Sequence, residues 1–149
     1  MLKLLKDFLD LEVPARRVSG SERYHLHLSV ASLLHEATRV DLAEHEKEHA
    51  AATAALADMF GLDEKACAAV LAEGRVRAKH LTSYFGPVSV IKRDMAQPER
   101  VRLIEHLWRI AYADGALDQY EDHYVRKIGH LLYVPNTEIL LARNRAHTG

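Results

Sequence analysis

The sequence predicts an all-α fold, a bundle of seven or eight helices that contains two pseudo-repeated helical hairpins. Ala and Leu, which rank among the strongest helix formers, supply 21 residues each of the 149. The β-branched residues Val, Ile and Thr together also supply only 21, and Gly and Pro add just 11. A chain of this length is typical of one compact domain, or of a duplicated one.

The first twenty residues, 1–20, are expected to precede the main domain. Residues 1–10 have the pattern of a short amphipathic helix, with Leu2, Leu5 and Leu9 on one side. The stretch that follows is typical of a linker because it combines a proline, a glycine and several charges. We expect the short helix to dock on the domain, and peripheral contact with a membrane surface is the alternative.

Three longer helices are expected in the first half of the chain. Ser19 or Ser21 is a suitable cap for the first of them, and Gly61 is expected to end the second. Asp63 is a suitable cap for the third. The expected ranges are about 21–41, 44–60 and 64–84.

Four further helices are expected in the second half. Pro87 suits the first turn of a short helix that follows the break at Gly86. The apolar run at residues 87–91 is the only plausible strand, and we reject it because no partner strand is present. The remaining three helices are expected at about 97–114, at 118–133 and from 135 onward.

The charge balance and the single cysteine exclude several classes of protein. Twenty basic residues face 21 acidic ones, so no basic surplus favours binding to nucleic acid. Cys67 cannot form an internal disulfide and is expected to be a small buried side chain, which suits a reducing compartment. The longest apolar runs are too short for a transmembrane helix. We therefore expect a cytoplasmic protein.

An internal repeat is the most informative feature of the sequence. In each half a helix ends near an aspartate, an acidic turn follows, and a glutamate comes seven residues after the aspartate. The pairs are Asp41 with Glu48 and Asp114 with Glu121. This duplication predicts two helical hairpins related by a pseudo-twofold axis. The repeats cover about residues 21–85 and 87–146.

The second repeat resembles the TerB (tellurite-resistance B) family. The resemblance is carried by the helix at residues 99–113, by the turn Ala113-Asp114-Gly115 and by Glu121, and it continues through residues 125–135. The first repeat departs from the pattern, since Val40-Asp41-Leu42 stands where Ala-Asp-Gly is usual. Residues 21–149 are thus identified as a TerB-like helical domain.

The resemblance implies an all-α fold, a link to tellurite and chemical-stress resistance, metal binding and no catalytic activity. We therefore expect a non-catalytic module of a bacterial stress response that binds a divalent metal ion, either Ca²⁺, Mg²⁺ or Zn²⁺. We also expect it to dock an unidentified protein partner. A pure helical scaffold is one alternative.

Helical spacing places the repeated acids on inward faces. Glu121 heads a stripe with Val125, Ile128 and Leu132, and Glu48 heads the matching stripe of the first repeat. Capping is one explanation, because Asp118 followed three residues later by Glu121 resembles a capping box. A weak cation site formed by Asp114, Asp118 and Glu121, together with Asp41 and Glu48, is the other explanation.

A second motif is His45-Glu46-Lys47-Glu48-His49, which matches H-E-x-x-H. On a helix the two histidines lie one turn apart and can bind zinc, with Glu46 as a base for a metal-bound water. This motif makes a zinc-dependent hydrolase the second alternative. We instead expect adventitious zinc binding by His45 and His49, since no third ligand follows the motif and no sheet is predicted to hold a peptide substrate.

The helix before the second turn combines a core aromatic residue with a polar stripe. Trp108 lies among apolar neighbours and is predicted to be in the core. Arg102, Glu105, His106 and Arg109 form a polar stripe, in which Glu105 and Arg109 have the spacing of an ion pair.

Overall fold

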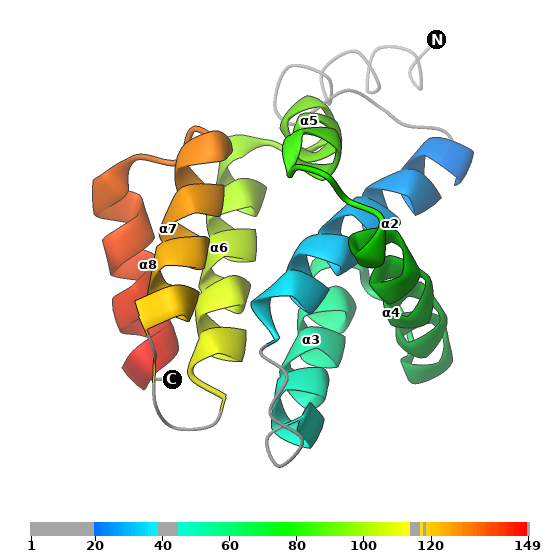
Figure 1. The fold of residues 1–149 in the computed structure, drawn as a ribbon, viewed down its shortest axis with the longest axis horizontal. Coiled ribbons are helices and arrows are strands. Elements are labelled where there is room, and N and C mark those ends of the chain that lie inside the picture. The colour runs from blue at the N-terminus through cyan, green and yellow to red at the C-terminus, as the bar shows by residue number, and fades with distance from the viewer. Residues whose placement is uncertain (1–19, 39–44, 114–116, 118, 149) are drawn as a thin grey trace, which may run out of the picture.

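The computed structural model describes residues 20–38, 45–113, 117 and 119–148. These residues form seven α-helices and contain no strand, which confirms the predicted all-α fold (Figure 1). The predicted helix at residues 1–10 and its linker lie outside the described residues. The helices are α2 (Gly20–Ala37), α3 (His45–Phe60), α4 (Glu64–Lys79), α5 (Phe85–Asp94), α6 (Gln97–Ala111), α7 (Gln119–Leu131) and α8 (Asn136–Thr148).

Helix α2 is the centre of the bundle. Every residue from Leu26 to Leu34 is buried, so this helix has no solvent-facing side over more than two turns. Its two buried serines return their hydroxyls to the helix itself: Ser29 donates to the carbonyl of His25, and Ser32 donates to that of Ser29. These bonds allow polar side chains to remain in an otherwise apolar core.

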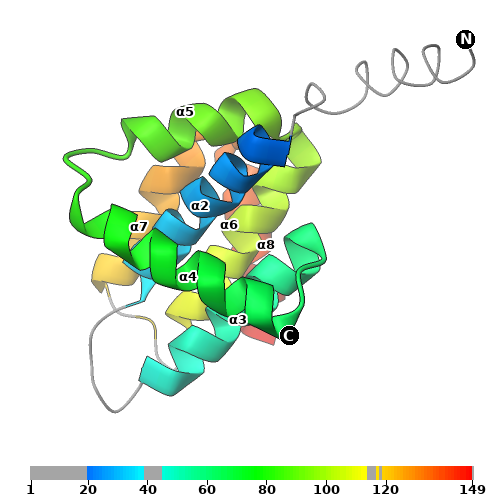
Figure 2. The ribbon, with the colours of Figure 1, turned by 90° about the vertical axis from the view of Figure 1, so that its right-hand side faces the viewer.

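The remaining helices follow the plan of the predicted repeat. Helices α2, α3 and α4 form the first set, α6, α7 and α8 form the second, and α5 connects them (Figure 1). In each set the first and third helices pack most extensively, α2 against α4 and α6 against α8. Figure 2 shows α5 lying across the end of the bundle near the start of α6.

Long-range hydrogen bonds fix the helices of the second set. The indole Nε1 of Trp108 on α6 donates to the carbonyl of Ile139 on α8, with 3.0 Å between the two atoms. The hydroxyl of Tyr124 on α7 donates to the carbonyl of Leu33 on α2 at 2.7 Å. Trp108 is fully buried, as predicted from its neighbours. The Tyr124 bond joins the two repeats directly.

Several predicted helix boundaries are confirmed. Asp63 caps α4 by accepting a hydrogen bond from the backbone N–H of Ala66 at 2.8 Å. Gly61 follows α3 with a φ of 66°, which a glycine adopts without steric cost. Pro87 lies in the first turn of α5, so the apolar run at 87–91 is helical and not a strand.

The predicted end of α4 near Tyr84 is wrong, because the helix ends at Lys79. The side-chain oxygen of Ser83 accepts a hydrogen bond from the backbone N–H of Phe85, where α5 begins. Hydroxyl side chains compete in this way with helical backbone bonds and favour turns. Helix α2 also ends earlier than predicted, at Ala37, and the Thr38 hydroxyl donates to the carbonyl of His35.

Helices α2 and α4 approach each other closely at Gly74. A Cβ atom added there would lie 2.6 Å from the Ala31 Cβ and 3.0 Å from the Ala31 carbonyl carbon. Backbone cannot rotate away as a side chain can, so only glycine fits without separating the helices. A Cβ atom added at Gly129 on α7 would lie 2.5 Å from the Ile139 Cδ1 atom, but that atom is the end of a flexible side chain.

We predict that Gly74→Ala destabilises the fold by about 1–3 kcal/mol, the usual cost of overpacking a core. This cost outweighs the gain of about 1 kcal/mol that alanine brings to a helix interior. Urea denaturation of the parent and the variant measures the difference. Gly129→Ala is the matched control and is expected to cost less, because the Ile139 side chain can move. A more stable Gly74→Ala variant would contradict the close packing of α2 on α4.

Candidate functional site

Two glutamates occupy matching places in the two repeats. Glu48 lies in the first turn of α3 and Glu121 in the first turn of α7. Both are buried, with relative exposures of 2% and 4%. The beginnings of α3 and α7 and the end of α6 lie at the same end of the bundle, the lower end in Figure 1. We call this region the acidic end.

The surroundings of these carboxylates confirm the predicted stripes. Val125, Ile128 and Leu132 are all fully buried behind Glu121, and Ala52 and Ala55 are buried behind Glu48. Carboxylates in the first turn of a helix interact favourably with the positive end of its dipole. A carboxylate among apolar side chains nevertheless requires hydrogen bonds, a cation or a proton. The acidic end is therefore the candidate functional site.

The other predicted acids of this end are not described. Asp41, Asp114 and Asp118 lie outside the described residues. The predicted capping box of Asp118 with Glu121 therefore stays a prediction. Among the side chains that the structure describes, no group of three or more His, Cys, Asp or Glu residues could hold a metal ion. The cluster of five acids stays a prediction.

The H-E-x-x-H motif lies at the start of α3. Glu46 and His49 are exposed, whereas the side chain of His45 lies outside the description. His49 and His35 line a small cavity of about 140 Å³ between α2, α3 and α4. Zinc binding by His45 and His49 therefore stays a prediction as well.

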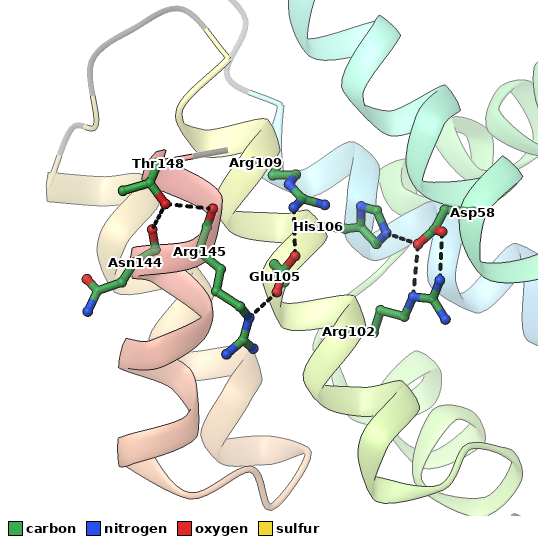
Figure 3. Close-up of polar contacts among 8 residues, drawn as sticks. All are labelled: Asp58, Arg102, Glu105, His106, Arg109, Asn144, Arg145 and Thr148. Carbon is green, nitrogen blue, oxygen red and sulfur yellow. Dashed lines mark hydrogen bonds and ion pairs between the residues drawn. The ribbon is translucent and has the colours of Figure 1, made fainter.

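A polar cluster that the sequence did not reveal joins α3 to α6. Figure 3 shows Asp58 of α3 between Arg102 and His106 of α6. The Arg102 guanidinium donates to both carboxylate oxygens of Asp58, at 2.9 and 2.7 Å. The Nε2 atom of His106 lies 2.7 Å from Asp58 Oδ2. Since Asp58 belongs to the first repeat and the other two residues to the second, the cluster links the repeats.

His106, which belongs to the predicted polar stripe of this helix, is buried and only 5% exposed. Burial lowers the pKa of His106, although its hydrogen bond to Asp58 acts in the opposite direction. We therefore assign a neutral ring that donates its Nε2–H at neutral pH. The hydrogen bonds from His106 and then Arg102 lower the pKa of Asp58, which remains a carboxylate.

The rest of the stripe forms an ion-pair network at the α6–α8 contact. Arg109 Nη2 lies 2.7 Å from Glu105 Oε2, which confirms the predicted pair one helical turn apart. Arg145 of α8 binds the second oxygen of the same carboxylate (Figure 3). Helical spacing predicted the first contact but carried no signal for the second, nor for Asp58, which is 48 residues from His106.

None of the described helices is both long and apolar enough to cross a membrane. The family model of tellurite resistance protein TerB matches residues 27–144, which is most of the chain and includes both buried glutamates. No curated protein and no solved structure gives a match.

We predict that the folded protein loses stability as the pH falls from about 7.5 to about 5.5. Burial lowers the pKa of His106 and also that of His27, where the charge of Arg23 adds to the effect. The unfolded chain therefore binds more protons below about pH 6.5, which favours unfolding. Urea denaturation across this pH range measures the slope.

The control for this prediction is His106→Gln. The glutamine amide can still donate to Asp58 but does not titrate, so its stability is expected to depend less on pH than that of the parent. The lowered pKa of Asp58 adds a further loss only in strong acid, below about pH 4. Identical pH slopes for parent and variant would show that His106 does not carry the effect.

Proposed function

Since the chain belongs to the TerB family of tellurite resistance proteins, we propose that it is a non-catalytic module of a bacterial response to tellurite or related chemical stress. In this proposal the acidic end holds a divalent cation, and the bundle docks a protein partner. We place it in the cytoplasm, because a chain with one cysteine suits a reducing compartment.

The matched burial of Glu48 and Glu121 carries the metal-binding part of this proposal. Each set of helices has a buried glutamate in the first turn of its second helix. Burying one such charge is costly, and a cation offsets this cost by supplying the opposite charge. Two matched carboxylates at one end of the bundle are therefore consistent with a shared ligand.

The sequence contains further acids between these helices. Asp114 and Asp118 fall in the connection between the end of α6 at Ala111 and the start of α7 at Gln119. Asp41 falls in the corresponding connection of the first repeat. Carboxylate oxygens are the ligands that Ca²⁺ and Mg²⁺ prefer, so these ions suit the site better than Zn²⁺ does.

The double variant Asp114→Asn with Glu121→Gln tests the cation site. Asn and Gln keep most of the capping geometry and remove two negative charges. We expect Ca²⁺ or Mg²⁺ to stabilise the parent and not the variant, by about 2.7 kcal/mol when the ion is at a hundred times its dissociation constant. Thermal melts across a series of ion concentrations measure the difference.

Two controls make this test specific. Glu64→Gln with Glu138→Gln removes two charges from the first turns of α4 and α8 and is expected to respond to ions as the parent does. His45→Ala with His49→Ala separates zinc bound by these histidines from zinc bound by carboxylates. Equal ion responses of the parent and the acidic-end variant would reduce these acids to a structural role.

The non-catalytic assignment makes a separate prediction. Zinc-loaded protein is expected to cleave casein no faster than its Glu46→Gln variant, which lacks the only carboxylate placed to act as a base in the H-E-x-x-H motif. Release of soluble peptides over several hours measures cleavage. Proteolysis by the parent that disappears in the variant would favour the zinc hydrolase instead.

A further inference from the structure

A cavity of about 570 Å³ opens at the other end of α7, away from the acidic end. It is lined by the α4–α5 connection, by α5 and by the second half of α7, together with Glu36 of α2 and Ala78 of α4. Its volume is in the range of small-molecule sites in proteins, about 300–1,000 Å³. The lining residues include aromatic, aliphatic and basic side chains, and we call this cavity the Tyr84 pocket after the tyrosine at its base. The residues used below are Tyr84, Phe85, Lys92, Lys127, Leu131 and Tyr133.

Large apolar side chains at this pocket are exposed to solvent. Phe85 is 77% exposed, Tyr133 is 71% exposed and Leu131 is 39% exposed. Scattered exposed hydrophobics are ordinary, but a group of them around one hollow marks a binding surface. Below them Tyr84 is partly buried and packs edge-on against Tyr124, with 5.6 Å between the ring centroids. The base of the pocket is therefore held by the core.

Tyr133 adopts a backbone conformation that is unfavourable for a bulky residue. Its φ is 60°, in the left-handed region, at the position after α7 where glycine is usual. A bulky residue is strained there, and the exposed ring gains little burial in return. Strain of this kind is characteristic of sites where a side chain has a function. The ring of Tyr133 is thus retained at a conformational cost at the edge of the pocket.

Two lysines place their positive charge over the aromatic rings. The Lys92 Nζ lies 4.3 Å from the centroid of the Tyr133 ring, and the Lys127 Nζ lies 5.3 Å from that of Tyr84. Glu36 is the one acid among the lining residues that the structure describes; burial and then the charge of Glu36 raise the pKa of Tyr84. The lysines therefore outnumber the acid, and the pocket favours a negatively charged ligand.

We propose that the Tyr84 pocket binds a small organic anion, a carboxylate carried on an aromatic or branched aliphatic body. The ammonium groups of Lys92 and Lys127 bind the carboxylate. The rings of Phe85 and Tyr133 cover the apolar body, which stacks on Tyr84. Nothing in this site depends on the acidic end, so it does not rest on cation binding there.

Isothermal titration with 2-naphthoate tests the charge requirement, and the neutral 2-naphthamide is the matched ligand. We expect the carboxylate to bind about tenfold or more tightly than the amide, since a hydrogen bond to a charged group contributes that much. Its affinity is expected to fall as NaCl rises from about 50 to about 500 mM, because salt screens partly exposed charges. Absence of binding, or equal binding of the two ligands, would overturn the proposal.

Variants then locate the site. The double variant Lys92→Met with Lys127→Met keeps an unbranched side chain of nearly the same length at both positions and removes the charge. It is expected to lose about tenfold or more in affinity for 2-naphthoate. Lys65→Met on the exposed face of α4 is the control and is expected to bind as the parent does. Amide shifts on adding 2-naphthoate should concentrate at residues 82–92 and 127–133. Shifts elsewhere would overturn the assignment.

Tyr133→Gly separates a binding role from a structural one. Glycine fits the positive φ without strain, so the variant is expected to melt at the same temperature as the parent or higher. Loss of 2-naphthoate affinity in a variant of unchanged or raised stability would support the proposed site. Affinity equal to that of the parent would overturn the role of the Tyr133 ring.

Discussion

The burial of α2 on all sides is the constraint on which the rest of the structure depends. A helix with no exposed face between Leu26 and Leu34 must be covered completely, and helices α3 to α7 all pack against it. Its polar groups must be satisfied inside the protein. The hydroxyls of Ser29 and Ser32 meet this requirement by donating to carbonyls of their own helix, and the Leu33 carbonyl accepts a bond from Tyr124. The Nε2 atom of His27 is buried without a hydrogen-bond partner among the described residues. The close approach at Gly74 follows from the burial of α2 as well.

This central position explains how two similar repeats form one core. In each repeat the first helix packs mainly against the third helix. The two repeats contact each other mainly through α3 and α6. The Asp58 carboxylate of one repeat accepts hydrogen bonds from both Arg102 and His106 of the other. His106 is buried, whereas the side chains of Asp58 and Arg102 are 40% and 56% exposed, so the polar link lies at the edge of the interface. It contributes directionality that apolar packing lacks. The duplicated glutamates are thereby held at one end of a single rigid unit.

Helix α7 has acidic residues in its first turn and basic residues towards its end, although the formal net charge of the whole protein is only −1. The helix has the buried Glu121 in its first turn, and towards its end it carries Lys127, which lines the Tyr84 pocket. Each end follows from a local requirement: a carboxylate suits a helix start, and basic residues suit a helix end. One helix thus connects a candidate cation site with a candidate anion site.

The sequence by itself determined the helical class and most helix boundaries, because these depend on local spacing and capping. Gly61, Asp63 and Pro87 act within a few residues of their own position, and the stripe of Glu121, Val125, Ile128 and Leu132 follows from one helical period. Only the tertiary structure decided which polar side chains meet. Asp58 and His106, or Tyr124 and Leu33, are far apart in the chain, and no periodicity relates them. Nothing in the sequence indicated that Tyr133 has a positive φ. That conformation favours glycine, and the tyrosine adopts it only because the surrounding fold holds it there.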